Sequence, residues 1–431
     1  MKDNFPEYYK SISYLEGLSN ISDSYQKTNL QSHPHPEIYL ERMQDLLDLI
    51  GNPEKDFKYI HITGTAGKGS VSKMVHDALV NNTKKSGLFT SPFVTSTIEK
   101  IQVGNKYIDP HRLAQISESL KPKIDHMSRY GRHGIPSYFE IIFAIALLNF
   151  KKENCEYVVL EVGLGGRYDA TNIIKNPLIT AITNIDLDHT QVLGKTKEKI
   201  AFDKAGIIKK NSTFFTTENN KKLLSIFKKE CILIGATYRP CNTQDLDYRQ
   251  KNMLLAKSIC EQIDIKINGN IEEYASLPAR FEVVERKPFV IIDGAHNLSK
   301  IQSVISNLKK IKYKRLSIII AISADKDWKE MLKIILPRVD HLFVTRFSVP
   351  GRKCVNPRNL LDFSKKIIPE KAIYLYTDPI EAFNEARKKL DTDDALLITG
   401  SFYLAGDIRG IYCPEKQILK QRSSKIRLQI K

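Results

Sequence analysis

The stretch "GTAGKGS", residues 64–70, has the residue types of a phosphate-binding loop. It follows the apolar run 59–63 and precedes a segment whose apolar residues have helical spacing. In such loops, backbone N–H groups and the helix start bind phosphate oxygens, a lysine meets the terminal phosphates and a hydroxyl reaches Mg²⁺. Lys68 and Ser70 supply these types. The alternative is a glycine-rich surface turn, and the flanking strand and helix favour the phosphate loop.

The loop is shorter than the usual pattern of a P-loop. Ile62 stands where that pattern has its first glycine, and Gly69 separates Lys68 from Ser70. The fit is therefore to a shorter form, G-x-x-G-K-G-S, in which the backbone donors are kept.

Acidic residues and one histidine follow two other strand-like runs. Glu161 opens "EVGLGGRYDATN", and Asp186, Asp188 and His189 stand in "NIDLDHT". In open α/β sheets ligands bind at the carboxyl ends of the strands, where carboxylates can ligate magnesium. The structural alternatives are a solvated loop acid, a helix cap and a core histidine. A P-loop in the same sheet favours the metal-binding interpretation.

Three later motifs add charged and polar residues. Lys204 stands in "DKAGIIKK", Arg280 in "PARFE", and "DGAHN" contains Asp293, His296 and Asn297. Each motif is short, and for Lys204 an ordinary surface ion pair is the alternative. They gain meaning only in combination.

The elements that must position these residues alternate between strands and helices, which predicts an α/β fold. A helix is expected over 36–51, a strand over 58–63 and a helix from Ser70; further strands are expected in "SGLFTS", "YVVLEVGLGG" and "LITAITNI". After residue 286 the pattern restarts with "FVIIDGAHN", "LSIIIAIS", "HLFVT" and "DALLITG". We therefore predict two domains: 1–286, with an N-terminal helical segment, and 287–431.

Composition is consistent with a two-domain cytoplasmic protein. The 431 residues are too many for one hydrophobic core, and 42% of them are hydrophobic and 27% charged. The start of the chain has no apolar signal region, and no apolar run is long enough to span a membrane. Six cysteines without CxxC spacing argue against disulfides or zinc and fit a reducing compartment.

The formal net charge of +17 suits an anionic partner. Nucleic acid is one possibility, and a polyanionic small substrate in a basic cleft is another. Part of the excess lies in the tail 412–431, which carries six Lys or Arg against one Glu. Charge alone does not choose between these classes.

Taken in order, the motifs resemble the folylpolyglutamate synthase/dihydrofolate synthase family of the Mur ligase superfamily. The resemblance covers most of residues 36–410 and is carried by "HITGTAGKGSVSKM", "GLFTSPFV", "EKIQV", "YFEIIFAIALLNF", "VVLEVGLGGRYDATN", "LDHTQVLGKTKEKIAFDKAGIIK", "PARFEVV", "IIDGAHN", "ISADKDW" and "ITGSFYLAGDIR".

The resemblance implies a P-loop ATPase-type central domain with a mostly parallel sheet and a smaller Rossmann-like glutamate ligase domain. It also implies a reaction, in which ATP activates a carboxylate as an acyl phosphate and the amine of L-glutamate then forms an amide. The expected partners are ATP, L-glutamate and a folate or dihydropteroate-type acceptor. We expect a monomer with no nucleic-acid or membrane partner.

Residue by residue, the resemblance assigns ATP binding to the loop and to the later motifs: Gly64, Thr65, Gly67, Lys68, Gly69, Ser70, Arg280, Asp293, His296 and Asn297. It assigns a first magnesium to Ser70, Ser91 and Glu161, and a second to His189 and a carbamylated Lys204. Lys68, His189 and Lys204 are the expected catalytic residues. Burial would keep Lys204 partly deprotonated, as carbamylation requires.

The sequence departs from the family pattern in the loop and in the acceptor-binding segment. Ala66 stands for an asparagine, Phe93 stands for a histidine, and Ile98-Glu99-Lys100 replaces a stretch that is arginine-rich in the family. Phe93 could stack on a pterin ring, and Lys100 could pair with an acceptor carboxylate. Two alternatives stay open: a glutamate ligase with a non-folate acceptor, and a nucleic-acid-stimulated P-loop NTPase.

Overall fold

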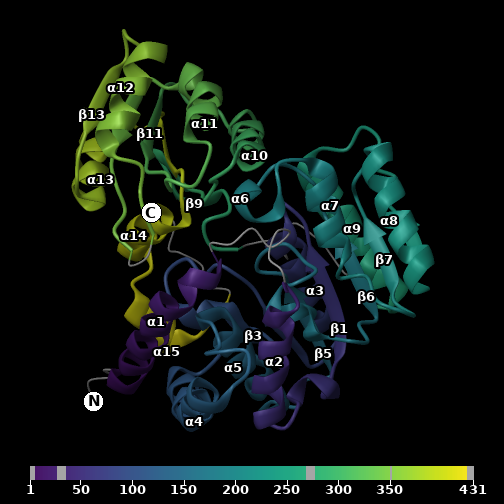
Figure 1. Cartoon of the computed structure of the whole chain (residues 1–431). Coiled ribbons are helices and arrows are strands. Elements are labelled where there is room, and N and C mark those ends of the chain that lie inside the picture. The colour runs from purple at the N-terminus through teal and green to yellow at the C-terminus, as the bar shows by residue number, and fades with distance from the viewer. Residues whose placement is uncertain (1–4, 27–34, 268–276, 350–351, 425–431) are drawn as a thin grey trace. The chain divides into compact units, whose positions relative to one another are not determined.

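The computed structural model describes residues 5–26, 35–267, 277–349 and 352–424 (Figure 1). The chain forms two compact units, each with its own sheet. Unit 1 comprises Met1–Pro92, Thr97–Ala275 and Arg422–Ser424, and unit 2 comprises Phe93–Ser96, Ser276–Gln421 and Lys425–Lys431.

Unit 1 contains a sheet of eight strands in which β1 lies between β5 and β6. In spatial order the strands are β4 (Lys106–Tyr107), β3 (Ile101–Val103), β2 (Ser86–Phe89), β5 (Tyr157–Glu161), β1 (Lys58–Thr63), β6 (Ile179–Ile182), β7 (Thr213–Thr216) and β8 (Thr237–Pro240). The pairs β2–β3 and β3–β4 are antiparallel, and the other neighbours are parallel. The carboxyl ends of β2, β5, β1 and β6 therefore lie at one edge of the sheet.

Helices cover this sheet because its strands are apolar on both faces, as parallel strands usually are. Apolar residues of α3 (Lys68–Asn81) and α9 (Tyr248–Gln262) pack against Ile60 and Ile62 of β1. Those of α7 (Lys197–Ala205) and α8 (Lys221–Ile234) form a second cluster with Ile182 and Phe214. The other α-helices in the described part of unit 1 are α1 (Pro6–Gln26), α2 (Ile38–Leu49), α4 (Pro110–Tyr130), α5 (Tyr138–Lys152) and α6 (Thr190–Leu193).

Unit 2 contains a sheet of six strands that is parallel except at one edge. Its spatial order is β13 (Ala372–Leu375), β12 (His341–Val344), β11 (Leu316–Ile320), β14 (Ala395–Thr399), β10 (Phe289–Ile292) and β9 (Glu282–Arg286), where β9 runs antiparallel to β10. Alternate residues serve opposite cores: Ile318 and Ile320 face α10 (Leu298–Leu308), α11 (Trp328–Ile335) and α12 (Pro357–Ile367), and Ile319 faces α13 (Pro379–Lys388) and α14 (Phe402–Tyr412).

The predicted fold class is confirmed: both sheets are α/β layers with mostly parallel strands. The expected strands and the helix over 36–51 are present, as β1, β2, β5, β6, β10, β11, β12, β14 and α2. The helix after the glycine loop begins at Lys68, two residues before the expected start at Ser70. Within the described ranges, every helix is too short or too polar to cross a bilayer.

The end of the described chain extends the first sheet. After α15 (Glu415–Gln421), the backbone N–H of Tyr107 donates to the carbonyl of Arg422 at 2.7 Å, and Ser423 pairs antiparallel with Lys106. The guanidinium of Arg422 also lies 2.7 Å from the carboxylate of Asp109. Residues 422–424 of the basic tail thus cover the β4 edge of unit 1.

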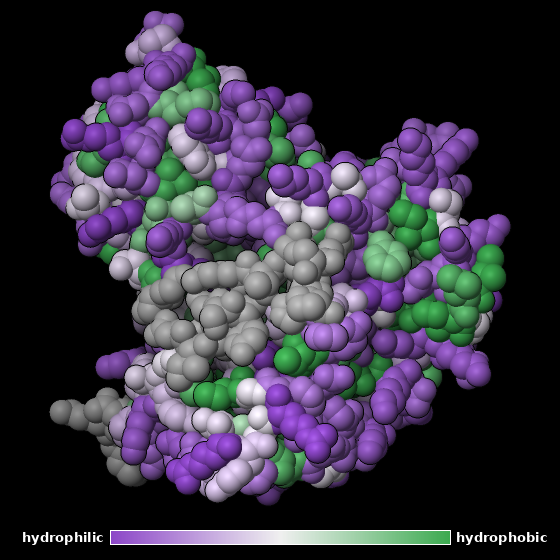
Figure 2. Space-filling model, viewed as in Figure 1, coloured by the Kyte–Doolittle hydropathy of each residue, from purple (hydrophilic) through white to green (hydrophobic). Residues whose placement is uncertain are grey.

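Most side chains on the face seen in Figure 2 are hydrophilic. Apolar side chains gather on the right of that view, where Figure 1 places α8. The end of α8 carries Ile232 and Leu233, each 70% exposed.

We expect that Arg42→Met lowers the free energy of unfolding by about 3–5 kcal/mol, because it leaves a buried carboxylate without its cation. Arg42 of α2 and Glu140 of α5 are each 4% exposed and 2.9 Å apart. Chemical denaturation followed by circular dichroism measures the change.

The matched control is Lys58→Met. Lys58 pairs with Glu156 at 3.0 Å, but their side chains are 53% and 43% exposed. This substitution should cost less than about 1 kcal/mol. Equal losses in the two variants would show that burial does not set the strength of the Arg42–Glu140 pair.

Candidate active site

The loop between β1 and α3 has the backbone geometry of a phosphate cradle. Gly67 precedes the helix with φ +83°, and a Cβ built there would lie 2.4 Å from Oδ1 of Asn252. A Cβ at Gly64 would lie 1.8 Å from Oγ1 of Thr183. Both positions thus exclude side chains, and the loop presents backbone at the N-terminus of a 14-residue helix, where partial positive charge favours anions.

Lys68 lies in the first turn of α3, and its side chain folds back over the loop. Its Nζ donates to the carbonyl oxygen of Gly64 at 2.9 Å. Gly69 and Ser70 follow in the same turn, so the lysine and the hydroxyl both belong to the start of the helix. The predicted phosphate-binding residues of the loop are therefore gathered around one cradle.

Glu161 and Ser91 meet at the carboxyl edge of the sheet. Glu161 ends β5 opposite Ile62 of β1 and is 4% exposed. Its Oε2 accepts a hydrogen bond from the backbone N–H of Ser91 at 3.1 Å, just after β2. Parallel pairing of β2, β5 and β1 thus joins two residues that are far apart in sequence.

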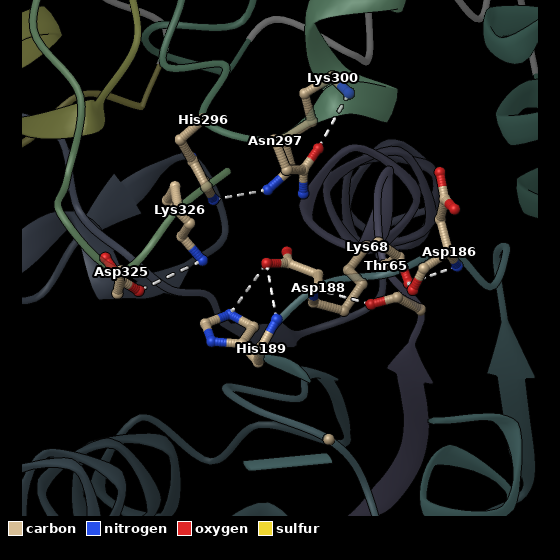
Figure 3. A network of polar contacts seen from close by, with 12 residues as sticks. Thr65, Lys68, Asp186, Asp188, His189, His296, Asn297, Lys300, Asp325 and Lys326 are labelled. Atoms are coloured by element: carbon tan, nitrogen blue, oxygen red, sulfur yellow. Dashed lines mark hydrogen bonds and ion pairs between the residues drawn. The ribbon is translucent and has the colours of Figure 1, made fainter. Parts of the chain in front are cut away.

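His189 follows β6 beside Asp188, as Figure 3 shows. Its backbone N–H donates to Oδ1 of Asp188 at 2.9 Å, and its Nε2 lies 3.9 Å from the same oxygen. The backbone of His189 is left-handed, with φ +49°. The carboxylate of Asp188 therefore fixes the backbone of His189 and lies near its ring.

Lys204 of α7 is buried, with 4% exposure. Its Nζ donates to the carbonyl of Gly165 at 3.4 Å. Burial, assisted by the charge of Lys68, lowers the pKa of Lys204 to about 7, against the opposing influence of Asp203, Asp188 and Asp169. A substantial fraction of the Lys204 amine is therefore uncharged at neutral pH. Sequence alone could only suggest this burial.

The glycine turn after β5 is fixed by buried polar groups. Asp169 accepts hydrogen bonds from the backbone N–H groups of Leu164 and Thr171, at 2.9 and 3.0 Å. The hydroxyl of Thr63, at the end of β1, donates to the carbonyl of Gly165 at 2.7 Å. The same carbonyl accepts from Lys204, so the turn links β1 to the buried amine.

Three of the predicted residues of unit 2 follow β10, and the fourth, Arg280, precedes β9. The carboxylate of Asp293 accepts from the backbone N–H groups of Phe281 and Ala295, at 2.7 and 2.8 Å. Burial raises the pKa of Asp293 to about 6, although the positive charge of Arg280 opposes this rise. Arg280 itself lies over the ring of Phe402, 4.1 Å from its centroid.

His296 and Asn297 are held at the start of α10 (Figure 3). Nδ1 of His296 donates to the carbonyl of Gly294 at 2.8 Å, and Nε2 accepts from Nζ of Lys300 at 2.9 Å. Oδ1 of Asn297 accepts from the backbone N–H of Lys300 at 3.0 Å, as a helix cap does. The capping role of Asn297 is thus present beside the predicted binding role.

Several residues at these sites were not predicted: Thr63, Asn184, Asp203 and Lys300. Asp203 directly precedes Lys204, and its buried Oδ1 has no hydrogen-bond partner among the residues that the structure describes. Lys300 lies in the first turn of α10, four residues after His296, which precedes the helix. Thr63 and Asn184 contact residues that are distant in sequence, so no local sequence pattern predicts these contacts.

The donor set suits a metal that shares its ligands with phosphate. Among the described residues, no three His, Cys, Asp or Glu side chains are grouped to hold a metal ion. Magnesium commonly takes one or two carboxylates and completes its shell with phosphate oxygens and water. Glu161, with Ser91 beside it, fits such a partial site. Asp203, whose buried Oδ1 has no hydrogen-bond partner among the described residues, directly precedes Lys204 in the chain.

Comparison with known proteins identifies two family domains in this chain. The model of the Mur ligase middle domain matches residues 62–283, and that of the Mur ligase glutamate ligase domain matches residues 279–402. A dihydrofolate synthase/folylpolyglutamate synthase of Bacillus subtilis is 28% identical over 86% of this chain and 94% of its own length.

Solved structures share the fold of this chain. The folylpolyglutamate synthase of Thermotoga maritima is 29% identical, with a TM-score of 0.74 over 86% of this chain and 92% of that one. A bifunctional folylpolyglutamate synthase/dihydrofolate synthase with Mn, AMPPNP and L-glutamate bound shares the fold at 23% identity, with a TM-score of 0.74 over 86% and 93% of the two chains. The chain belongs to the folylpolyglutamate synthase/dihydrofolate synthase family of Mur ligases.

Proposed function

We propose that the protein is an ATP-dependent ligase that joins L-glutamate to the carboxylate of a folate-type acceptor. The observation that carries this proposal is the grouping in unit 1 of a P-loop lysine, a buried carboxylate and a buried lysine with a lowered pKa. The match of both Mur ligase domains to this chain supports the same chemistry.

The reaction that suits this site has two steps. An oxygen of the acceptor carboxylate attacks the γ-phosphorus of ATP, and ADP leaves, giving an acyl phosphate. The amine of glutamate then attacks the acyl carbon, and the tetrahedral intermediate expels phosphate and loses a proton to give the amide. Negative charge builds on oxygens in both steps, so fixed cations and backbone donors are the main requirement.

Within unit 1, we assign ATP phosphate binding to Gly64, Thr65, Gly67, Lys68, Gly69 and Ser70. The loop amides from Gly67 onward would bind phosphate oxygens, and Lys68 would exchange its contact with the Gly64 carbonyl for the terminal phosphates. Mg²⁺ would supply electrostatic stabilisation of the phosphoryl oxygens. Ser70, Ser91 and Glu161 would hold one ion.

A second ion would be held by His189 and by Lys204 as a carbamate. The amine of Lys204 would add to CO₂ and release a proton, which turns a buried cation into an anionic oxygen ligand. The lowered pKa of Lys204 supports this step, because only the uncharged amine can attack CO₂. Asp188 would keep His189 oriented.

For unit 2, we assign ATP or glutamate binding to Arg280, Asp293, His296 and Asn297. Arg280 lies over the ring of Phe402. Asp293 is held by two backbone donors, so both side chains are oriented before a ligand arrives. We retain residues 1–286 as the ATP-binding domain and 287–431 as the glutamate ligase domain. The family models divide the functions in the same order along the chain.

The acceptor assignment is helped by where the departures from the family pattern lie. Ile98 is fully buried. Lys100 is 5% exposed, and its Nζ donates to the hydroxyl of Tyr138 at 3.2 Å. An apolar Ile98 in the core does not remove donors from an acceptor pocket. The expected pairing of Lys100 with an acceptor carboxylate loses support, because Tyr138 already contacts this amine.

We further propose a monomer that acts in the cytoplasm on ATP and small anionic substrates. All six cysteines are free thiols, which suits a reducing compartment. Anionic substrates also give the net charge of +17 a role that needs no nucleic acid.

With Mg²⁺, ATP and labelled glutamate, we expect incorporation of glutamate into dihydropteroate or tetrahydrofolate. Mass spectrometry of the products measures it. Incorporation only into a non-folate carboxylate would leave the ligase chemistry and refute the folate acceptor. ATP hydrolysis stimulated by an oligonucleotide, without incorporation, would refute both.

Lys68→Ala should lower kcat by at least about a hundredfold, because a cation beside the transferred phosphoryl group is lost. Initial rates of product formation measure the effect, and the circular dichroism spectrum should not change. Lys58→Ala, at the opposite end of β1, serves as the control with near-normal rates. Near-normal turnover in a folded Lys68→Ala variant would remove Lys68 from the mechanism.

Lys204→Ala should be inactive, with partial recovery when acetate fills the gap. In bicarbonate, native mass spectrometry of the wild-type protein should reveal a gain of one CO₂ that Lys204→Ala lacks. Since the pKa of Lys204 is about 7, the neutral amine and hence the gain should increase as pH rises from 6 to 8. Full activity of Lys204→Ala, or no mass gain at pH 8, would contradict carbamylation.

A further inference from the structure

The tip of the P-loop is bound to the segment that follows β6. The backbone N–H of Thr65 donates to the carbonyl of Asn184 at 2.9 Å, and the backbone N–H of Ala66 donates to Oδ1 of Asn184, also at 2.9 Å. The hydroxyl of Thr183 donates to the carbonyl of Ala66 at 2.6 Å. The two residues after β6 thus hold both backbone groups of Ala66.

The carboxamide of Asn184 has one end on the loop and the other end available. Because the Ala66 amide is a donor, the atom that accepts from it is the Asn184 oxygen, and Nδ2 is the remaining donor. Within the described part of the chain, Nδ2 makes no hydrogen bond, and it is not among the buried atoms that lack a partner. It therefore keeps access to solvent or to a ligand.

Ala66 leaves the loop tip without a polar side chain that could bind phosphate. The methyl side chain of Ala66 is 2% exposed and offers no polar group at the loop tip. The two polar atoms of a carboxamide share one carbon, so Nδ2 of Asn184 lies close to the Ala66 amide that its Oδ1 contacts. Because the backbone N–H of Ala66 already donates to Oδ1, Nδ2 of Asn184 is the donor that remains at this place.

We propose that Asn184 is a phosphate-binding residue: its Oδ1 fixes the loop tip and its Nδ2 donates to the terminal phosphate of ATP, in place of the side chain that Ala66 lacks. This inference rests on the proposed binding of ATP by the P-loop. It adds a residue from outside the loop, and outside the predicted site, to the recognition of the γ-phosphate.

The same contacts tie the P-loop to the segment that carries His189. The hydroxyl of Thr65 donates to the carbonyl of Asp186 at 3.1 Å and accepts from the backbone N–H of Asp186 at 2.9 Å (Figure 3). Residues 183–186 therefore move with the loop tip, and His189 follows three residues later. A phosphate bound by Asn184 would therefore contact the same segment of the chain that carries His189.

Asn184→Asp separates the two functions of the carboxamide. The aspartate keeps an oxygen that can accept from Ala66, but it replaces the Nδ2 donor by an anionic oxygen that repels phosphate. Titration calorimetry with AMPPNP and with ADP, in Mg²⁺ at pH 8, measures both affinities. We expect the Kd of AMPPNP to rise at least about tenfold and that of ADP to rise clearly less, since ADP lacks the third phosphate.

Asn184→Ala provides a second variant without the added charge. It should also weaken AMPPNP more than ADP, by a smaller factor. Equal losses for the two nucleotides in both variants would indicate a deformed loop and overturn the proposal. A wild-type Kd for AMPPNP in folded Asn184→Asp would overturn it as well.

The matched control is Asn82→Asp, the same substitution at the other end of α3. Nδ2 of Asn82 donates to the carbonyls of Ala78 and Lys266, at 2.9 and 2.6 Å, well away from the P-loop end of the helix. Both nucleotides should bind this variant as they bind the wild-type protein. If the wild-type protein bound neither nucleotide, the proposed function itself would fail, which differs from failure of the Asn184 variants alone.

Discussion

Parallel pairing of β2, β5, β1 and β6 is the constraint on which the site of unit 1 depends. Four parallel neighbours end at one edge, so residues that follow them in sequence become neighbours in space. Glu161 meets the Ser91 backbone, and Asn184 meets the P-loop, only because the strand register brings those ends level. A shift of register in β6 would separate Asn184 from Ala66 without altering either residue.

Burial then decides which charges the site can keep. Lys204 loses hydration in the core, so its ammonium form is disfavoured and its pKa falls to about 7. Burial raises the pKa of Asp203 and that of Asp169, because it disfavours their charged carboxylate forms. Three ionisable groups near one glycine turn are thus each pushed towards neutrality. The carbamylation that we propose for Lys204 would use this uncharged amine, and a metal ion would stabilise the charged form of the neighbouring acids.

Local patterns made the P-loop and the apolar strands predictable from sequence, but not the contacts between segments. A window of a few residues is enough to identify the glycines at 64 and 67 and the apolar runs of β1, β5 and β11. The edge strands β8 and β13 are short and partly exposed, and β8 also lacks the apolar run that identifies a buried strand. β9 precedes residue 287 yet pairs with β10, because an antiparallel edge strand needs only a short connection. Asn184 could not be identified at all, since its role depends on strand register.

The departures from the family pattern acquire different meanings once the neighbours are known. Ile98 and Lys100 belong to the 3₁₀-helix η2 (Thr97–Lys100), all of whose residues are buried. Packing in the core therefore constrains which residues can occupy these two positions. Ala66, in contrast, stands at the loop tip where its backbone is held by Thr183 and Asn184. A small residue is tolerated there because the loop conformation is imposed from β6, and the polar group that a longer side chain would bring is available from Asn184. The chemistry of a P-loop therefore belongs to the loop together with the strand end that holds it, and a motif read alone identifies only part of the binding site.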